Sequence, residues 1–282
     1  MVKHLPPGIK QLLALRNPHP RPTPPFSRLD AVLRNTLQDA QARKAEKGWL
    51  TLATCTLLTA NAPPTVGRLY HVTTRTDPDN ASTRGPLATS VEKAALMRES
   101  ALKSCIFVGV PRTILSLAAL NEAIEEDVRD GLRKTSKRTA TKESVDEIMT
   151  RGRALWGSIY APHAEKLYNK LGSYHPDFIG VRRGARAAAR GAAEQGNLSR
   201  ALGSVVGAAC LRAEGGVGPQ LTSHVFGLLK ARGAPGLDAE DAWLASDAGA
   251  EWVVRTVDAI CDVAKPELAA ADAGAESTPA KL

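Results

Sequence analysis

Apolar residues recur three and four positions apart along most of this chain, and short segments rich in proline and glycine separate the apolar runs. Because an α-helix has 3.6 residues per turn, this spacing gathers apolar side chains on one helical face. No stretch shows the alternation of apolar and polar positions that is typical of a half-buried strand. The pattern predicts an all-α fold, with helices within 27–60, 66–76, 89–109, 110–132, 154–178, 198–216, 219–233 and 237–265.

Several of these helices have recognisable starts. Thr89 with Glu92, and Ser144 with Glu147, have the spacing of a capping box, in which a hydroxyl and a carboxylate satisfy the first backbone amides. Asp238 is a further predicted N-cap.

Two stretches of the chain follow the same plan. Both "LATCTLLTANAPPTVGRLYH" (52–71) and "VVGAACLRAEGGVGPQLTSH" (205–224) read as an apolar helix, a turn of small residues or proline, and a helix that reaches a histidine. This internal echo predicts two pseudo-repeats that bury their apolar faces against each other. It divides the chain into a proline-rich arm (1–28), a first repeat (29–130), a basic linker (131–149), a second repeat (150–267) and a flexible tail (268–282). We expect the arm to lie over the body or to be disordered, with at most one short helix.

Composition narrows the class of protein. The 282 residues suffice for a sizeable core, and the low aromatic content of 4% suits a helical protein better than an all-β one. No apolar run reaches the roughly 18 residues of a membrane-spanning helix. The N-terminus also lacks the apolar core of a secretory signal. We therefore expect no membrane association.

The chain carries a formal charge of +8, and its basic residues cluster in two places. One cluster is the linker segment "RKTSKRTATK" (133–142). The other places Arg182, Arg186 and Arg190 on one face of a helix. Since no nucleic-acid-binding signature accompanies them, a solvated face or a site for an anionic metabolite is favoured over nucleic acid.

The four cysteines, Cys55, Cys105, Cys210 and Cys261, are far apart and lie in apolar stretches. This favours buried, reduced thiols over a disulfide framework. No metal-ligand spacing, glycine-rich phosphate loop or nucleophile elbow is present, so we expect no cofactor.

Four segments carry a resemblance to a known family: "GWLTLATCTLLTANAPPTVGRLYH" (48–71), "FVGVPRTILSLAALNEA" (107–123), "IYAPHAEKLYNKLGSYHPDFIG" (159–180) and "ACLRAEGGVGPQLTSHVFGLLKA" (209–231). On them the chain resembles the carboxymuconolactone decarboxylase and alkylhydroperoxidase D superfamily, in particular its fungal, often peroxisomal, members. The resemblance implies an AhpD-like helical fold and a symmetric homo-oligomer, which we expect to be a dimer or trimer. The small-residue helix "ALGSVVGAACL" (201–211) suits such an interface. Members include decarboxylases of lactone acids and thiol-dependent peroxide reductases.

The reductase members of that superfamily carry a Cys-x-x-Cys-x-x-x-His motif, and this chain keeps only the histidine. With His224 as the motif histidine, the two thiol positions hold Val217 and Gln220. The corresponding positions before His71 hold no cysteine either. Without a nucleophilic thiol, dithiol reduction of a peroxide has no first step. We therefore expect no dithiol peroxidase activity.

Acid/base chemistry on a small acid needs only a proton donor and acceptor, and a cation to hold the carboxylate. His224 is the first catalytic candidate, with Glu214 as a partner across the turn. Arg212 is a candidate for holding the carboxylate, and Gln220 for donating to a carbonyl. The alternative is a histidine that only closes the helical hairpin.

His71 is the second catalytic candidate, with Tyr70 beside it as a binding residue. Tyr160, His163 and Lys166 are spaced by three residues, and a structural role is favoured for them. Two functions therefore stay open. One is an enzyme of the decarboxylase or isomerase kind that acts on a small carboxylic or acyl metabolite. The other is a non-catalytic oligomeric binding protein or scaffold.

The sequence ends in Ala280, Lys281 and Leu282, a close variant of the Ser-Lys-Leu signal that the peroxisomal import receptor reads. The small, polar residues before it suit a flexible end. We expect a peroxisomal matrix protein with that receptor as a partner.

Overall fold

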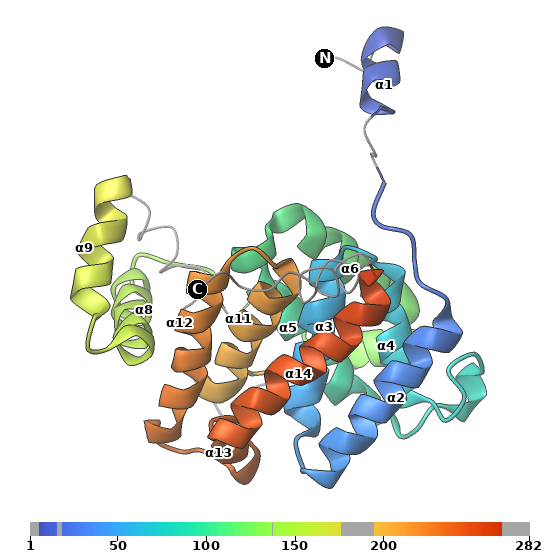
Figure 1. The fold of residues 1–282 in the computed structure, drawn as a ribbon. Helices are drawn as coiled ribbons and strands as arrows, with labels where there is room; N and C mark the ends of the chain where they lie inside the picture. Colours follow the sequence, from blue (N-terminus) through green and yellow to red (C-terminus); the bar gives the residue numbers. More distant parts are fainter. Residues whose placement is uncertain (1–5, 16–18, 137, 176–194, 267–282) are drawn as a thin grey trace, which may run out of the picture.

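The computed structural model describes residues 6–15, 19–136, 138–175 and 195–266. Helices dominate these residues and no strand occurs among them, so the predicted all-α class is confirmed (Figure 1). The helices before the linker are α1 (Pro7–Leu13), α2 (Phe26–Ala42), α3 (Glu46–Ala60), α4 (Pro64–Thr74), η1 (Ala81–Thr83), α5 (Leu87–Val108), α6 (Val110–Ala123) and α7 (Glu126–Gly131). Those after it are α8 (Val145–Tyr160), α9 (Ala164–Tyr174), α11 (Arg200–Glu214), α12 (Gly218–Leu229), η2 (Lys230–Gly233), α13 (Ala239–Leu244) and α14 (Asp247–Ala264).

Helices α3 and α11 form the centre of the molecule. They pack directly against each other, and both contact α5 and α14. In α3 every residue from 48 to 60 is buried, and α11 buries most of its length, including Val205, Ala209 and Cys210. The small-residue helix predicted for an interface between copies is therefore a core helix of the chain itself. The helices that the echo places at equivalent positions lie side by side, while the two-repeat division stays a prediction.

The turn after each central helix ends it for an identifiable reason. Asn61 caps α3 in the left-handed region (φ 58), and Pro63 and Pro64 lead into α4. Gly215 and Gly216 follow α11 with φ values of 75° and 67°, which glycine adopts readily. Each turn reverses the chain and lays α4 or α12 beside the helix that precedes it.

Of the three predicted helix starts, one has the expected capping hydrogen bond and two do not. Asp238 is the N-cap of α13, and its side chain accepts a hydrogen bond from the Asp241 amide, as predicted. The predicted capping box at Thr89 is wrong, because α5 begins at Leu87, after Pro86, and no side chain caps it. Ser144 does occupy the N-cap position of α8, but its hydroxyl makes no capping bond.

The stretch 110–132, predicted as one helix, is two. Ile124 and Glu125 adopt extended backbone conformations between α6 and α7. This break allows the Glu125 carboxylate to meet α4, as described below.

Among its described residues, the N-terminal arm contacts the body through Arg21. The Arg21 amide and Nε donate to Asn61 O (2.9 Å) and Ala60 O (3.1 Å), at the end of α3. Figure 1 shows α1 standing away from the body, and all of its residues are exposed. The short predicted helix is therefore present, but it does not lie over the body.

Part of the sequence interpretation lies outside the described residues. This holds for the basic face of Arg182, Arg186 and Arg190, and for Ala280, Lys281 and Leu282. In the described part of the chain, no helix is both long and apolar enough to cross a membrane.

Candidate functional site

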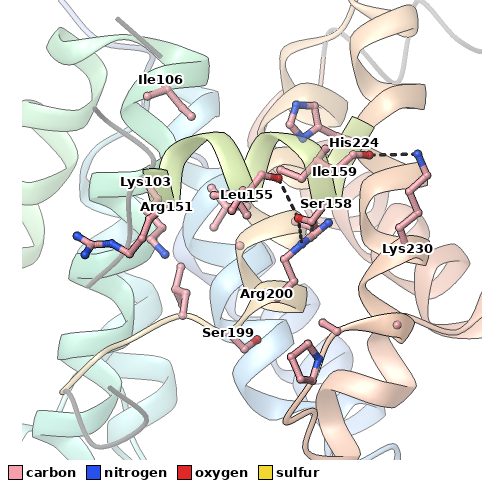
Figure 2. A pocket seen from close by; sticks show the side chains of 18 of the residues that line it. Lys103, Ile106, Arg151, Leu155, Ser158, Ile159, Ser199, Arg200, His224 and Lys230 are labelled. Carbon is pink, nitrogen blue, oxygen red and sulfur yellow. Dashed lines mark hydrogen bonds between the residues drawn. The ribbon is translucent and has the colours of Figure 1, made fainter. Parts of the chain in front are cut away.

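A pocket of about 780 Å³ lies where α8, α11 and α12 meet, and α5 forms a further wall. Figure 2 shows α8 crossing this pocket, with Leu155 and Ile159 among the side chains that line it. The lining is more apolar than polar. A cavity of this size encloses a small organic molecule.

The charged side chains in this pocket have one sign. Lys103 comes from α5, Arg151 from α8, Arg200 from α11 and Lys230 from the start of η2. Among the described residues that line the pocket, none is aspartate or glutamate. Such a lining favours an anionic ligand with an apolar body.

His224 lies in the wall of this pocket, on α12, and is only 5% exposed. Its Nε2 is 3.4 Å from the Tyr160 hydroxyl, at the end of α8. The imidazole also meets the Phe107 ring edge to face, with centroids 5.1 Å apart. A titratable histidine therefore borders the apolar cavity beside a second proton-bearing group.

Gly207 on α11 makes room for this imidazole. A Cβ atom at position 207 would lie 2.5 Å from His224 Nδ1, closer than two unbonded atoms can approach. The small-residue pattern of α11 thus serves two purposes, close helix packing and a seat for His224.

Arg200 is held in place by side-chain and backbone oxygens around the pocket. Its Nε donates to Ser158 Oγ (3.2 Å), a second nitrogen donates to Gly227 O (3.0 Å), and a third donates to Ser204 Oγ. Ser199, just before it, is the N-cap of α11. The guanidinium and the positive end of the α11 dipole therefore lie together at the pocket.

The structure does not bring Glu214, Arg212 or Gln220 to this pocket. Glu214 pairs with Arg112 of α6, and Arg212 pairs with Asp258 of α14 (2.6 Å). Gln220 is exposed. His224 packs on Gly207 of α11, and Glu214 lies seven residues further along that helix. This separation is about 10 Å along the helix axis, so Glu214 does not reach the pocket.

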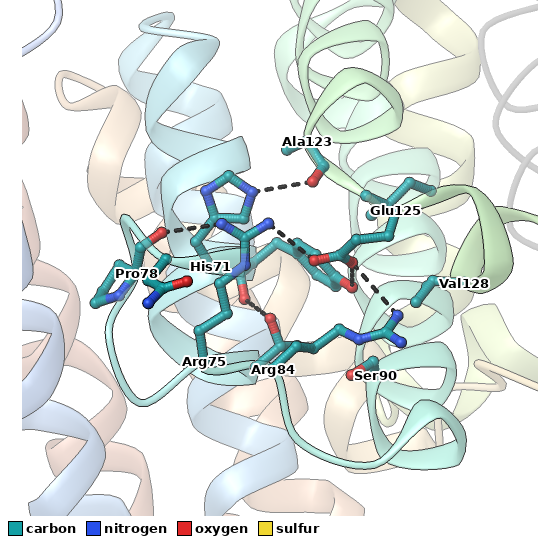
Figure 3. A network of polar contacts seen from close by, with 12 residues as sticks. His71, Arg75, Pro78, Arg84, Ser90, Ala123, Glu125 and Val128 are labelled. Atoms are coloured by element: carbon teal, nitrogen blue, oxygen red, sulfur yellow. Dashed lines mark hydrogen bonds and ion pairs between the residues drawn. The ribbon is translucent and has the colours of Figure 1, made fainter. Parts of the chain in front are cut away.

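The second candidate pair, His71 and Tyr70, lies in a separate polar network, of which Figure 3 shows His71, Arg75 and Glu125. His71 Nε2 is 2.9 Å from Ala123 O, and the Tyr70 hydroxyl donates to Glu125 Oε2 (2.6 Å). Glu125 also accepts from Arg75 (2.8 Å). Burial lowers the pKa of His71 and raises that of Tyr70, to which the Glu125 carboxylate adds. Tyr70 is fully buried, which indicates that this network stabilises the fold.

The polar network around Arg68 also stabilises the fold. Its guanidinium pairs with Asp30 (2.6 Å) and with Asp79, and lies over the Phe26 ring. These contacts join α2, α4 and the following loop.

Sequence reasoning missed most of the pocket. The sequence pattern does not distinguish Lys103, Arg151 or Arg200, and the spacing of Tyr160 groups it with His163 and Lys166 rather than with His224. One signal was present: Arg151, Leu155, Ser158 and Ile159 have the spacing of one helical face, and all line the pocket. That face mixes cations and apolar residues, which is also the pattern of an ordinary surface helix.

All four cysteines are on helices and none forms a disulfide. Cys55 of α3 and Cys210 of α11 are fully buried, while Cys105 is partly exposed. Burial and a hydrogen bond with Cys210 raise the pKa of the Cys55 thiol. Burial raises the pKa of Cys261 to about 12. A raised pKa disfavours the thiolate, which is the reactive form.

No three histidine, cysteine, aspartate or glutamate side chains in the described ranges are grouped so that they could hold a metal ion. Comparison with known proteins adds no assignment. The chain matches no protein-family model, no curated protein and no solved structure, so its resemblance to the carboxymuconolactone decarboxylase superfamily stays a prediction.

Proposed function

We propose that this chain is a carboxymuconolactone decarboxylase-like protein that binds a small carboxylic or acyl metabolite in the pocket under α8. The observation that carries the proposal is a largely apolar cavity of about 780 Å³ whose charged lining residues are all basic and whose wall contains a buried histidine. The apolar lining suits the body of the metabolite, and the cations suit its acidic group.

Each side chain has a distinct part in this proposal. Arg200, held by Ser158, Ser204 and Gly227, supplies a fixed positive charge for the carboxylate. His224 gives and takes the proton, because imidazole changes charge between about pH 5 and 8. The Tyr160 hydroxyl, 3.4 Å from Nε2, orients the ring.

Binding of octanoate by calorimetry tests the ligand class, with octan-1-ol as the uncharged comparison. We expect octanoate to bind more tightly than the alcohol. Arg200→Gln should weaken octanoate binding about tenfold or more, since a hydrogen bond to a charged group contributes about 1.5–3 kcal/mol. Arg212→Gln is the matched control, because Arg212 pairs with Asp258 outside the pocket. Equal affinities for acid and alcohol, or equal effects of the two variants, would contradict the proposal.

Two further variants test the chemistry. His224→Gln should abolish any turnover of small acids, and replacement of all four cysteines by alanine or serine should not. Peroxide reduction with a dithiol donor is expected from neither protein. Loss of an activity in the cysteine-free protein that His224→Gln retains would overturn this assignment.

The alternative is a non-catalytic binding protein or scaffold with the same fold. The packing of His224 against Phe107 and Gly207 favours it, because a ring held this closely can serve the core alone. Binding of octanoate by the wild type and by His224→Gln, with no turnover of small acids by either, would select this alternative.

A peroxisomal address is a separate part of the proposal and is supported by Ala280, Lys281 and Leu282. A protein tagged at its N-terminus should be found in peroxisomes, and removal of Leu282 should leave it in the cytosol. Unchanged punctate localisation after that removal would refute the address.

A further inference from the structure

Lys103 differs from the other lysine of the pocket in how its ammonium group is held. Lys230 Nζ donates to Ile159 O (3.1 Å) and Ala161 O (2.6 Å), the last carbonyls of α8. Lys103 Nζ makes a longer ion pair, with Glu99 Oε1 of the same helix 3.7 Å away. That same Glu99 oxygen also accepts a hydrogen bond from Arg138. The Lys103 amine is therefore the less tethered of the two.

The surroundings of Lys103 favour a neutral amine. Its side chain is 18% exposed and reaches the cavity from the middle of α5. Burial lowers its pKa, and Arg138 lowers it further, while Glu99 opposes both. The other titratable groups that line the same cavity are Arg151, Arg200, His224 and Lys230, and none of them is acidic. A lysine desolvated among cations is the kind that acts as a nucleophile at neutral pH.

The position of Lys103 relative to the other groups suits an attack on a carbonyl. Phe107 lies one helical turn after Lys103 on α5, and its ring meets the His224 imidazole. Lys103, His224 and Arg200 all line this cavity, from α5, α12 and α11. A ligand whose carboxylate is held at Arg200 would have its apolar chain in the cavity that the amine and the imidazole line.

We propose that Lys103 forms an imine with the ketone carbon of an oxo acid bound in this pocket. The inference rests on the proposed function and names its substrate class. The neutral amine nitrogen attacks the carbonyl carbon, the carbon–oxygen double bond is lost, and the oxygen leaves as water with one proton from the amine and one from the solvent. The product is an iminium ion, R₂C=NH⁺–Lys, with no change in oxidation state.

The iminium ion is an electron sink for the neighbouring carbon. His224 takes a proton from that carbon, the bonding pair moves to form an enamine, and the iminium nitrogen becomes neutral. Return of the proton and addition of water release the ketone and the free amine. In a 3-oxo acid the same sink accepts the pair of the bond to the carboxylate, and carbon dioxide leaves instead of a proton.

Reductive trapping tests the inference on the wild-type chain. The protein is incubated with 5-oxohexanoate, a stable oxo acid, and sodium cyanoborohydride, with hexanoate as the comparison that lacks a ketone. We expect one adduct per chain, with a mass increase equal to that of the acid less one oxygen atom, and tandem mass spectrometry should place it on Lys103. Hexanoate should protect Lys103 by competition for the pocket.

The pH profile and two variants separate a nucleophile from a structural lysine. Trapping on Lys103 should reach half its maximum at a lower pH than trapping on the lysines of the urea-unfolded chain. Lys103→Arg keeps the charge and should lose the adduct while it still binds hexanoate. His224→Gln should keep the adduct but slow the exchange of ketone-adjacent hydrogens for deuterium at least tenfold, as followed by proton magnetic resonance.

The outcomes distinguish this inference from the proposed function. Binding of both acids without an adduct on Lys103, or adducts spread over surface lysines, overturns the imine and leaves the acid-binding pocket standing. Failure of both acids to bind overturns both.

Discussion

Single residues decide the shape of the pocket wall. Gly207 seats His224, and Gly227 of α12 leaves room for Ile159 of α8, whose methyl group a Cβ there would meet at 3.1 Å. Glycine is otherwise unfavourable inside a helix, by about 1 kcal/mol relative to alanine. The helical conformation of Gly207 needs no special backbone freedom, so its value lies in the space it leaves.

Gly207→Ala should therefore destabilise the protein, although alanine is the better helix former. The added methyl group must displace the His224 ring, and overpacking of a core costs about 1–3 kcal/mol. Gly203→Ala, one turn earlier in α11, is the control, because nothing lies within 4 Å of its Cβ position. It should be neutral or stabilising by up to about 1 kcal/mol. Urea denaturation measures both, and equal effects would show that His224 moves aside without cost.

The buried His71 should make stability depend on pH. Burial lowers its folded pKa below that of the unfolded chain, so below about pH 6.5 the unfolded state binds a proton that the folded state does not. The stability linked to His71 is thus complete above its unfolded pKa and is lost as pH falls towards its folded pKa. His71→Gln should lose less unfolding free energy between pH 7 and 5 than the wild type. The exposed His163, changed to Gln, is the control, and parallel pH profiles for all three proteins would contradict this account.

At the scale of elements, the sequence predicts where the helices lie along the chain far better than it predicts which helices pack against one another. Asn61 and two prolines mark the turn from α3 into α4, and glycine marks the end of α11, so local chemistry is enough to place them. The break at Ile124 carries no such mark, and it arises because Glu125 meets Tyr70 and Arg75 of the distant α4. The pocket has the same origin, since its cations come from α5, α8, α11 and η2. Periodicity shows which face of each helix is apolar, but it does not show which helices share a cavity.

Helix α8 depends on a few polar contacts at its C-terminal end. Lys230 Nζ donates to Ile159 O and Ala161 O, where the helix dipole favours a cation. Trp156 Nε1 donates to Ala164 O (3.0 Å), which ties α8 to α9. These contacts hold in place the helix that crosses the pocket.

Lys230→Met should loosen the end of α8. The variant loses two charge-assisted hydrogen bonds, so amide hydrogen exchange over 156–161 should speed up about tenfold or more. Octanoate affinity should fall with it, because the ordered pocket wall is part of the binding site. Lys166→Met, on the exposed side of α9, is the control. Unchanged exchange in Lys230→Met would mean that apolar packing alone holds α8.

At the scale of the whole molecule, burial of α11 changes where contact between copies can occur. Its small residues face α3, α5, α12 and α14 of the same chain, so they cannot also face a second copy. The outer face of α6 is different, since Val110 and Ile114 are 56% and 59% exposed and lie one turn apart. Leu115 beside them is 40% exposed. This apolar face of α6 is therefore a candidate surface for the homo-oligomer that the family resemblance implies.

Light scattering at about 50 µM tests the oligomer and its surface together, because this concentration exceeds the dissociation constants of micromolar dimers. The wild type should give two or three times the chain mass of 29.9 kDa. Ile114→Lys should shift the mass towards one chain, since a buried, unpaired ammonium is costly at an apolar interface. Phe226→Lys is the matched control, because Phe226 is 56% exposed on α12, away from α6. A wild-type mass of one chain would contradict the oligomer. An equal shift from both variants would instead show that α6 is not the specific surface and that the contact is spread over the molecule.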